Sequence, residues 1–200
     1  MTEFIRILLP FYFILYFGIA FVAKSIIVAK RIGKNPIVLP KDESAYGLIG
    51  MYFKITMFTM FIYVSLFAIF HRYNKYFLPI KVLEKNELIY CGIFLLIFSL
   101  IWTIIAQKHM KNSWRIGIDN QMKTELITNG LFSISRNPVF FGMILSLIGL
   151  FLITPNSLTL IFLILGYILI QIQIRLEEEH LTKMNGEKYI KYKNQTRRLI

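Results

Sequence analysis

Long apolar stretches separated by short polar segments are the dominant pattern of the chain. A helix needs about 20 residues to cross the hydrocarbon core of a bilayer. Three stretches in the first half have about this length: Ile7 to Ala23, Ala45 to Phe70, and Leu88 to Gln107. One charge, Lys54, interrupts the second stretch, and its ammonium can snorkel toward the headgroups on an aliphatic stem. The pattern predicts three transmembrane helices within residues 1–110.

The second half contains a longer apolar stretch that is typical of a helical hairpin. Between Arg136 and Arg175 there are 38 residues without a charge, about twice what one span needs. Turn-forming residues interrupt this stretch at Thr154-Pro155-Asn156-Ser157. We therefore expect a hairpin over residues 138–174. Its first arm, Val139 to Ile153, is short, so it lies nearly upright, thins the bilayer or stops before the far side.

Composition indicates that lipid is the main solvent of this chain. Apolar residues make up 56% and charged residues 17% of it, against about 45–50% and 25% in soluble domains. We predict an all-α polytopic membrane protein, one domain over residues 1–200, with about five transmembrane helices and a C-terminal interfacial helix. In the tail, residues 177–200, a stop at Asn185-Gly186 precedes a short helix, and we expect its Tyr189 and Tyr192 at headgroup depth.

The net charge of +12 follows the positive-inside pattern of membrane proteins. Residues 24–41, 108–136 and 175–198 carry seventeen Lys and Arg, and the alternate segments, at residues 6 and 72–85, carry five. This predicts an outside N-terminus and a cytoplasmic C-terminus. The basic residues flank helices and do not form a patch with interleaved aromatics, so nucleic acid is not an expected partner. The single cysteine, Cys91, and three scattered histidines predict neither a disulfide framework nor a metal site.

Two polar clusters bracket the hairpin and carry the candidate chemistry. The upstream cluster extends from Thr124 to Gly142, and the downstream cluster contains Gln171, Gln173, Arg175 and the glutamates 177–179. A hairpin returns the chain to the side it left, so both clusters lie at the cytoplasmic end. Such polar groups on an otherwise apolar helix usually face a cavity or the bundle interior.

The helical repeat divides the downstream cluster into two faces. Gln173 and Glu177 form one i, i+4 pair, and Gln171, Arg175 and Glu178 form a separate stripe. A structural interpretation stays open for each cluster. Gly130 and Pro138 also fit a plain loop and helix start, and the glutamates also fit a solvated helix end.

Between about Ser113 and Ile200 the chain contains a set of motifs in a fixed order: Gly130-Leu131-Phe132, Arg136-Asn137-Pro138-Val139-Phe140-Phe141-Gly142, the apolar hairpin, Glu177-Glu178-Glu179-His180-Leu181, Asn185-Gly186, Tyr189 and Tyr192. In these motifs the chain resembles the isoprenylcysteine carboxyl methyltransferase and phospholipid methyltransferase superfamily of integral membrane enzymes. The departures are Asn137 in place of a histidine, Phe132 and Phe140 in place of tyrosines, and Asn185 in place of a phenylalanine.

The resemblance implies S-adenosylmethionine as cofactor and residues 111–200 as the catalytic region. The implied cofactor-binding residues are Thr124, Glu125, Leu126, Ile127, Phe132, Asn137, Pro138, Val139, Phe140, Glu177 and Glu178. The candidate catalytic residues are Arg136, Gln173 and Arg175. Gln173 stands where the eukaryotic relatives have an arginine facing the substrate, so the resemblance implies a site without that fixed cation.

The expected function is transfer of a methyl group from S-adenosylmethionine to a lipophilic acceptor within the bilayer. Two alternatives remain at this stage: an NADPH-dependent membrane reductase of the sterol and steroid type, and a membrane scaffold without catalysis. The sequence identifies neither the acceptor nor the oligomeric state.

Overall fold

The chain is described by a computed structural model that covers residues 1–38, 44–117 and 125–200. Seven α-helices occupy most of these residues, as follows: α1 (Thr2–Phe17), α2 (Lys24–Ile32), α3 (Ala45–Ile69), α4 (Asn86–Met110), α5 (Pro138–Ile153), α6 (Ser157–Asn185) and α7 (Glu187–Gln195). A π-helical segment, η1 (Gly18–Ala23), joins α1 to α2. Short 3₁₀ turns and two strands complete the fold: η2 (His71–Phe77), η3 (Lys81–Leu83), η4 (Lys111–Ser113), η5 (Gly130–Ser133), β1 (Ile37–Val38) and β2 (Ile116–Gly117).

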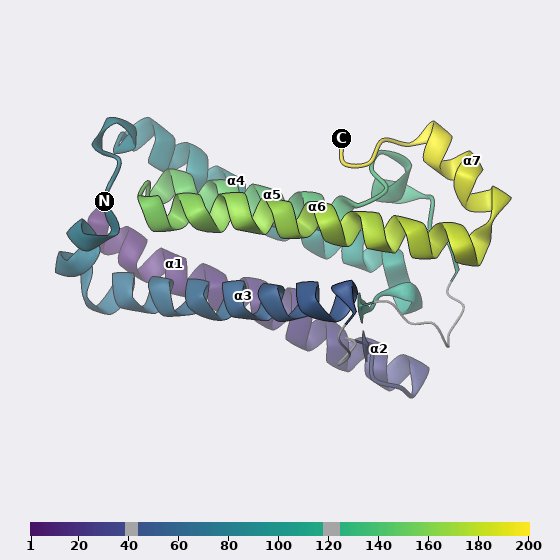
Figure 1. The fold of residues 1–200 in the computed structure, drawn as a ribbon. Helices are drawn as coiled ribbons and strands as arrows, with labels where there is room; N and C mark the ends of the chain where they lie inside the picture. Colours follow the sequence, from purple (N-terminus) through teal and green to yellow (C-terminus); the bar gives the residue numbers. More distant parts are fainter. Residues whose placement is uncertain (39–43, 118–124) are drawn as a thin grey trace.

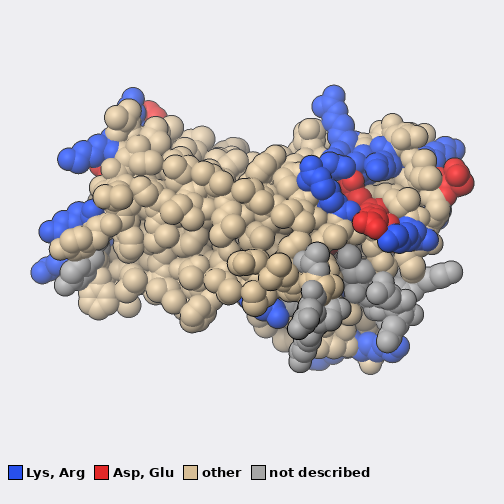
Figure 2. Space-filling model, in the orientation of Figure 1, with Lys and Arg blue, Asp and Glu red and all other residues tan. Residues whose placement is uncertain are grey.

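The long helices extend along one common direction and form a bundle (Figure 1). The N-terminus and the tip of the α5–α6 hairpin lie at one end, and α2, α7 and the C-terminus lie at the other. Lys and Arg gather at the two ends and leave a broad, almost uncharged belt between them on the face in Figure 2. Four helical stretches are long and apolar enough to cross a membrane: Thr2–Ile32, Tyr46–Ile69, Asn86–Ser113 and Ser157–Asn185. The predicted all-α polytopic membrane fold is confirmed.

The first helix is longer than the apolar pattern predicts. The first apolar stretch ends at Ala23, but Lys24–Ile32 continues the helix as α2 and ends only at Gly33, which has a left-handed φ of 69°. The Lys24 ammonium donates to the Gln107 carbonyl at 2.8 Å, and the Gln107 side-chain amide donates to the Ala20 carbonyl at 2.7 Å. The basic stretch therefore stays helical because α4 binds both its lysine and a carbonyl of the π-helical segment.

The turn of the α5–α6 hairpin is buried in protein. The Asn156 side chain accepts from the Thr159 amide and donates to the Tyr63 hydroxyl at 2.8 Å, and the Ile80 amide donates to the Pro155 carbonyl at 2.9 Å. Backbone polar groups exposed to hydrocarbon are costly, so a turn within the membrane needs such partners. The 16 residues of α5 span about 24 Å at 1.5 Å per residue, and α3 and the segment after it supply partners for the turn.

The hairpin packs closely against α4 through glycines. A Cβ atom at Gly92 would lie 2.8 Å from the Gly149 carbonyl oxygen, and one at Gly149 would lie 2.9 Å from the Gly92 carbonyl oxygen. Small residues permit such close approach of helix backbones in membranes, where packing replaces the hydrophobic effect as the source of association. The Tyr12 hydroxyl bonds to the Ser99 hydroxyl at 2.8 Å and fixes α1 on another face of α4.

The C-terminal tail folds back onto the start of α5 through one carboxylate. Glu178, on α6, accepts from Arg136 Nη2 at 2.9 Å and from Arg198 Nη2 at 3.0 Å. The Asn137 side-chain amide donates to the same carboxylate at 3.3 Å and to the Arg198 carbonyl at 3.0 Å. We call Glu178, Arg136, Asn137 and Arg198 the carboxylate clamp. The clamp joins three parts of the chain: the residues at the start of α5, the polar end of α6, and the segment after α7.

The tyrosines of α7 differ from the expectation. Tyr189 and Tyr192 are buried in the protein, and the Tyr192 hydroxyl donates to the Phe132 carbonyl at 2.6 Å. Burial raises the pKa of Tyr192 to about 12, so this hydroxyl keeps its proton at physiological pH. The two side chains therefore pack α7 onto the bundle and do not face headgroups.

Substitution of Glu178 should destabilise the fold much more than substitution of its neighbour. Glu178→Gln leaves two guanidinium groups without their counter-ion, and removal of one partner of a buried ion pair costs about 3 to 5 kcal/mol. We expect the lower end of this range because Arg198 is partly exposed. Glu179, which pairs with Lys183 at the surface, is the matched control, and Glu179→Gln should leave stability unchanged. Thermal unfolding in detergent measures both, and equal midpoints would contradict the assigned role.

Candidate functional site

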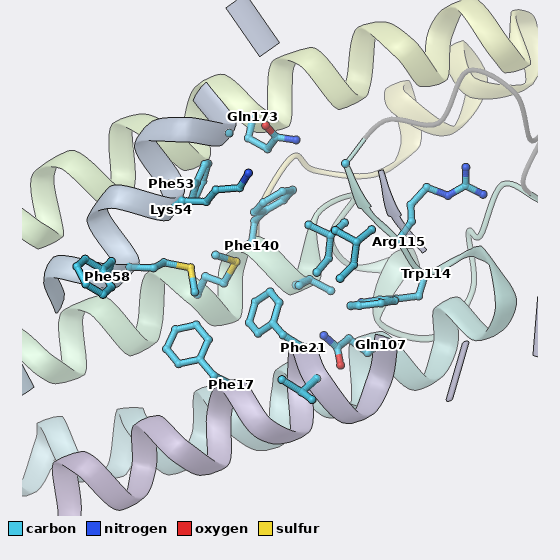
Figure 3. Close-up of a pocket in the computed structure, with 18 of the residues that line it drawn as sticks. Phe17, Phe21, Phe53, Lys54, Phe58, Gln107, Trp114, Arg115, Phe140 and Gln173 are labelled. Atoms are coloured by element: carbon cyan, nitrogen blue, oxygen red, sulfur yellow. The ribbon is translucent and has the colours of Figure 1, made fainter. Parts of the chain in front are cut away.

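A large apolar cavity lies between the N-terminal helices and the hairpin, toward the end that holds α2 and α7. Its volume is about 660 Å³, within the range of about 300 to 1,000 Å³ usual for small-molecule sites. α1, η1, α3, α5, α6 and residues 114–117 line it (Figure 3). Aromatic side chains make up much of the wall: Phe13, Phe17, Phe21, Phe53, Phe58, Phe61, Trp114 and Phe140. We call it the apolar cavity.

The apolar cavity opens sideways between α1 and α3. Ile14 on α1 and Phe58 on α3 line it and are also largely exposed, at 66% and 65%. Phe61, one turn after Phe58, shares both properties. These residues belong to the apolar stretches long enough to cross a membrane. The opening therefore lies on the side of the bundle that faces lipid in a membrane.

A second, smaller cavity has charged as well as apolar side chains in its wall and lies between the loop before α5 and the end of α6. It is lined by the following residues: Met110, Ser113, Arg115, Gly117, Glu125, Leu126, Ile127, Phe132, Arg136, Glu177, His180, Leu181 and Tyr192. Two glutamates, two arginines and a histidine face the same space as several apolar side chains. We call it the polar cavity. It suits a ligand that carries charges of both signs together with a flat apolar part.

The two cavities share three lining residues, Arg115, Gly117 and Glu177. Glu177 stands on α6, and the other two belong to the segment around β2. A group bound in the polar cavity and a group bound in the apolar cavity therefore meet beside the Glu177 carboxylate. This junction is the position where a reaction between two such ligands would take place.

The junction depends on a strand pairing between distant segments. β1 pairs in parallel with β2, with Ile37 opposite Ile116 and Val38 opposite Gly117. Gly117 has a φ of 102°, and a Cβ atom there would lie 2.7 Å from the Val38 carbonyl carbon. Only glycine fits this approach without displacing backbone. The segment after α2, for which the sequence predicted no role, thus forms one side of the junction.

The loop that forms the rim of the polar cavity is fixed by α4. The Leu131 amide donates to His109 Nδ1 at 3.3 Å, and the Ser113 hydroxyl donates to the Glu125 carbonyl at 3.3 Å. Gly130 has a φ of 61°, and a Cβ atom there would lie 2.6 Å from the His109 ring. The glycine of the Gly130-Leu131-Phe132 motif therefore allows the loop to turn against the histidine, and this turn directs Phe132 inward, where it is buried.

On α6, the Gln173 side-chain amide donates to the Glu177 carboxylate at 3.0 Å and to the Tyr46 hydroxyl at 3.3 Å. The helical spacing predicted that these two residues share a face, and the structure shows them bonded. Gln173 lines the apolar cavity, whereas Glu177 reaches both cavities. A neutral amide therefore faces the apolar cavity, and a carboxylate faces the junction.

The structure distributes the other predicted residues over both cavities and the carboxylate clamp. Glu125, Leu126, Ile127, Phe132 and Arg136 line the polar cavity, and Val139 and Phe140 line the apolar cavity. Asn137 and Glu178 form part of the clamp, and the Pro138 carbonyl accepts from the Trp102 ring at 2.8 Å. Thr124 lies outside the described residues.

Arg175 does not reach either cavity. Its guanidinium is exposed and donates to the carbonyl and the side-chain oxygen of Gln171, one turn earlier on the same helix. The stripe of Gln171, Arg175 and Glu178 therefore does not form a common site. Glu178 turns inward to the clamp, and the other two bond to each other at the surface.

Several lining residues have no predicted role from the sequence. The sequence pattern gives Arg115 and Gly117 no role of their own, and it predicts only snorkelling for Lys54. Tyr46 lines the apolar cavity from the first turn of α3. The pairing of residues 37–38 with 116–117 brings distant parts of the chain together, and no local pattern signals it.

Comparison with known proteins identifies the family. The sequence model of the phospholipid methyltransferase family matches residues 88–188, which is half of the chain. A search of curated proteins gave no match. The matched range begins in α4 and ends in α7, so it contains the hairpin, the clamp residues Arg136 and Glu178, and most of the polar cavity. The resemblance found in the sequence motifs is confirmed at this level, and the chain belongs to the phospholipid methyltransferase family.

Proposed function

We propose that the protein is an integral membrane methyltransferase that uses S-adenosylmethionine and methylates a lipophilic acceptor. One observation carries the proposal: a polar cavity and a lipid-facing apolar cavity meet at Glu177. A methyltransferase for a membrane-dissolved acceptor needs this arrangement, because its two substrates differ in polarity and arrive from different solvents. Family membership supports the reaction class.

The residues of the polar cavity fit S-adenosylmethionine. This cofactor carries an ammonium and a sulfonium, a carboxylate, ribose hydroxyls and an adenine ring. Glu177 and Glu125 suit the ammonium and the hydroxyls through charge-assisted hydrogen bonds, and Arg115 suits the carboxylate. Leu126, Ile127 and Phe132 provide apolar contact for the adenine. The chemistry of the cavity wall thus matches the ammonium, the hydroxyls, the carboxylate and the adenine of the cofactor.

Arg136 has a positioning role in this proposal. Its guanidinium donates to Glu178, to the Lys193 carbonyl at 2.9 Å and to the Thr196 carbonyl. Through these hydrogen bonds Arg136 holds Glu178 in place. It thereby fixes the end of α6 and, with it, the neighbouring Glu177. These contacts favour an orienting role for Arg136 over binding of the cofactor's carboxylate.

The chain contributes orientation and exclusion of water to the reaction. Bound S-adenosylmethionine supplies a methyl group on a positively charged sulfur, which an in-line nucleophile displaces. The aromatic wall of the apolar cavity keeps water away from the junction, and Gln173 is placed to orient the acceptor head by hydrogen bonds. Positioning of two reactants in this way replaces a bimolecular encounter by a local one. The acceptor is expected to react with its nucleophile already deprotonated, as a carboxylate or a neutral amine does.

Calorimetric titration of the purified protein tests the cofactor directly. S-Adenosylhomocysteine should bind and raise the unfolding temperature, because a ligand that binds only the folded state stabilises it. NADPH should do neither. Stabilisation by NADPH alone would reject the proposed function in favour of a reductase.

The proposed orientation has the C-terminus and the site in the cytoplasm. In a Cys91→Ala background, Lys191→Cys should react with a membrane-impermeant thiol reagent only from the cytoplasmic side, and Lys75→Cys only from outside. Both positions are exposed, so access depends on the side of the membrane. Reaction of both from the same side would contradict the orientation.

Glu177→Gln should weaken binding of S-adenosylmethionine by roughly 1.5 to 3 kcal/mol, the scale of a hydrogen bond to a charged group. The substitution keeps the shape of the side chain but removes its charge at the junction. Glu179→Gln, two positions later at the surface, serves as the control and should leave the affinity unchanged. Calorimetry on both variants measures the difference, and identical affinities would show that Glu177 does not contact the cofactor.

Gln173→Ala should lower turnover of the acceptor by about tenfold, the factor that corresponds to loss of about 1.4 kcal/mol of hydrogen bonding. Its effect on cofactor affinity should be smaller than that of Glu177→Gln, because Gln173 lines only the apolar cavity. Gln171→Ala, at the surface of the same helix, should retain full turnover. Loss of turnover in Gln171→Ala with normal turnover in Gln173→Ala would show that the other face of α6 contacts the acceptor.

A further inference from the structure

Lys54 brings a positive charge into the apolar cavity. It lies in the middle of α3, nine residues after the first helical residue, Ala45, and it lines the cavity. Figure 3 shows its side chain extending from α3 toward the part of the cavity bounded by Phe140 and Gln173. The ammonium is thus directed toward the junction between the two cavities.

A lysine at this depth in a membrane helix needs a compensating partner. Intramembrane cations are costly and usually pair with an anion or serve a function. In the part of the chain that the structure describes, neither a hydrogen bond nor an ion pair involves Lys54, although its neighbours on the cavity wall, Gln173 and Glu177, bond to each other. The side chain is exposed, and it lines the cavity. The charge is therefore available to a ligand.

The other charged groups of the apolar cavity differ from Lys54 in their position. Arg115 and Glu177 stand at the junction and also line the polar cavity, whereas Lys54 lines only the apolar cavity. Gln173, which also lines the apolar cavity, is neutral. Among the residues that the structure describes, Lys54 is therefore the cation that lines the apolar cavity without also lining the polar cavity.

We propose that Lys54 is a specificity-determining residue, whose ammonium binds an anionic group, a carboxylate or a phosphate, on the head of the acceptor. This inference rests on the proposed function and adds to it the residue that recognises the head group. The apolar tail of such a lipid lies along the aromatic wall, with the opening between α1 and α3 on its path from the bilayer. The anion meets the ammonium, and the nucleophile extends to the junction at Glu177. The Lys54 ammonium thus fixes how far the head group of the acceptor reaches toward the junction.

Binding of three single-chain probes tests the proposal: palmitate, hexadecyl phosphate and hexadecanol. They differ in the head group, and Trp114, which lines the cavity, reports binding through its fluorescence in a Trp102→Phe background. The wild-type cavity should bind at least one of the two anionic probes about tenfold more tightly than hexadecanol, as expected for a charge-assisted contact. Preference for palmitate identifies a carboxylate as the ligand chemistry, and preference for hexadecyl phosphate identifies a phosphate.

Three variants test whether Lys54 recognises the anionic probe or only snorkels. Lys54→Gln should abolish the preference for the anionic probe and leave hexadecanol binding unchanged, whereas Lys54→Arg should retain the preference. Lys30→Gln, which removes the same charge from an exposed position at the end of α2, should behave as wild type. If Lys54→Gln binds all probes as wild type does, or the wild-type protein binds hexadecanol equally well, the lysine only snorkels and the inference is wrong.

A parallel titration with S-adenosylhomocysteine separates this inference from the proposed function. Lys54→Gln should bind it with wild-type affinity, which also shows that the variant is folded. Failure of the wild-type protein to bind S-adenosylhomocysteine would reject the proposed function, whereas loss of the Lys54-dependent preference with normal binding of S-adenosylhomocysteine would reject only the assignment of Lys54.

Discussion

The ion pairs of Glu178 are the contacts on which the polar end of the molecule depends. One carboxylate holds Arg136, which precedes α5, and Arg198, which follows α7. Because Arg136 also binds carbonyls at the end of α7 and in the segment that follows it, the loop, the end of α6 and the tail form one unit. The desolvation of a buried ion pair offsets much of its attraction. The clamp therefore contributes geometry more than stability, and it fixes the glutamate next to it, Glu177, at the junction of the cavities.

The sequence predicts those features that depend on local pattern. Apolar runs, the break at Thr154 to Ser157 and the stop at Asn185-Gly186 correspond to α1, α3, α4, the hairpin and α7, because helix length in a membrane and turn chemistry are local constraints. The prediction is wrong at Lys24, where helix continues into a basic segment. There a long-range partner, Gln107, binds the backbone and the lysine, and hydropathy does not register such contacts.

At the site too, the sequence predicts what depends on local pattern and misses what depends on long-range contacts. Helical spacing places Gln173 and Glu177 on one face, and the structure shows them hydrogen-bonded. Spacing also groups Glu178 with Arg175, yet the structure separates them, because Arg136 and Arg198 attract the glutamate and Arg175 stays at the surface. Gly117 and Arg115 reach the junction only through the pairing of β1 with β2. Parallel pairing of two-residue strands far apart in the chain has no periodic signal.

The sideways opening of the apolar cavity has a kinetic consequence. A ligand that passes between α1 and α3 comes from the bilayer, so the concentration it presents to the protein is its mole fraction among the surrounding lipids. Addition of inert lipid at a fixed bulk amount dilutes the ligand in two dimensions and slows its capture, whereas a larger aqueous volume has little effect on a ligand that partitions almost wholly into lipid. In the proposed function, the aromatic rim formed by Phe58 and Phe61 would therefore select acceptors by their partition coefficient before any head group is recognised.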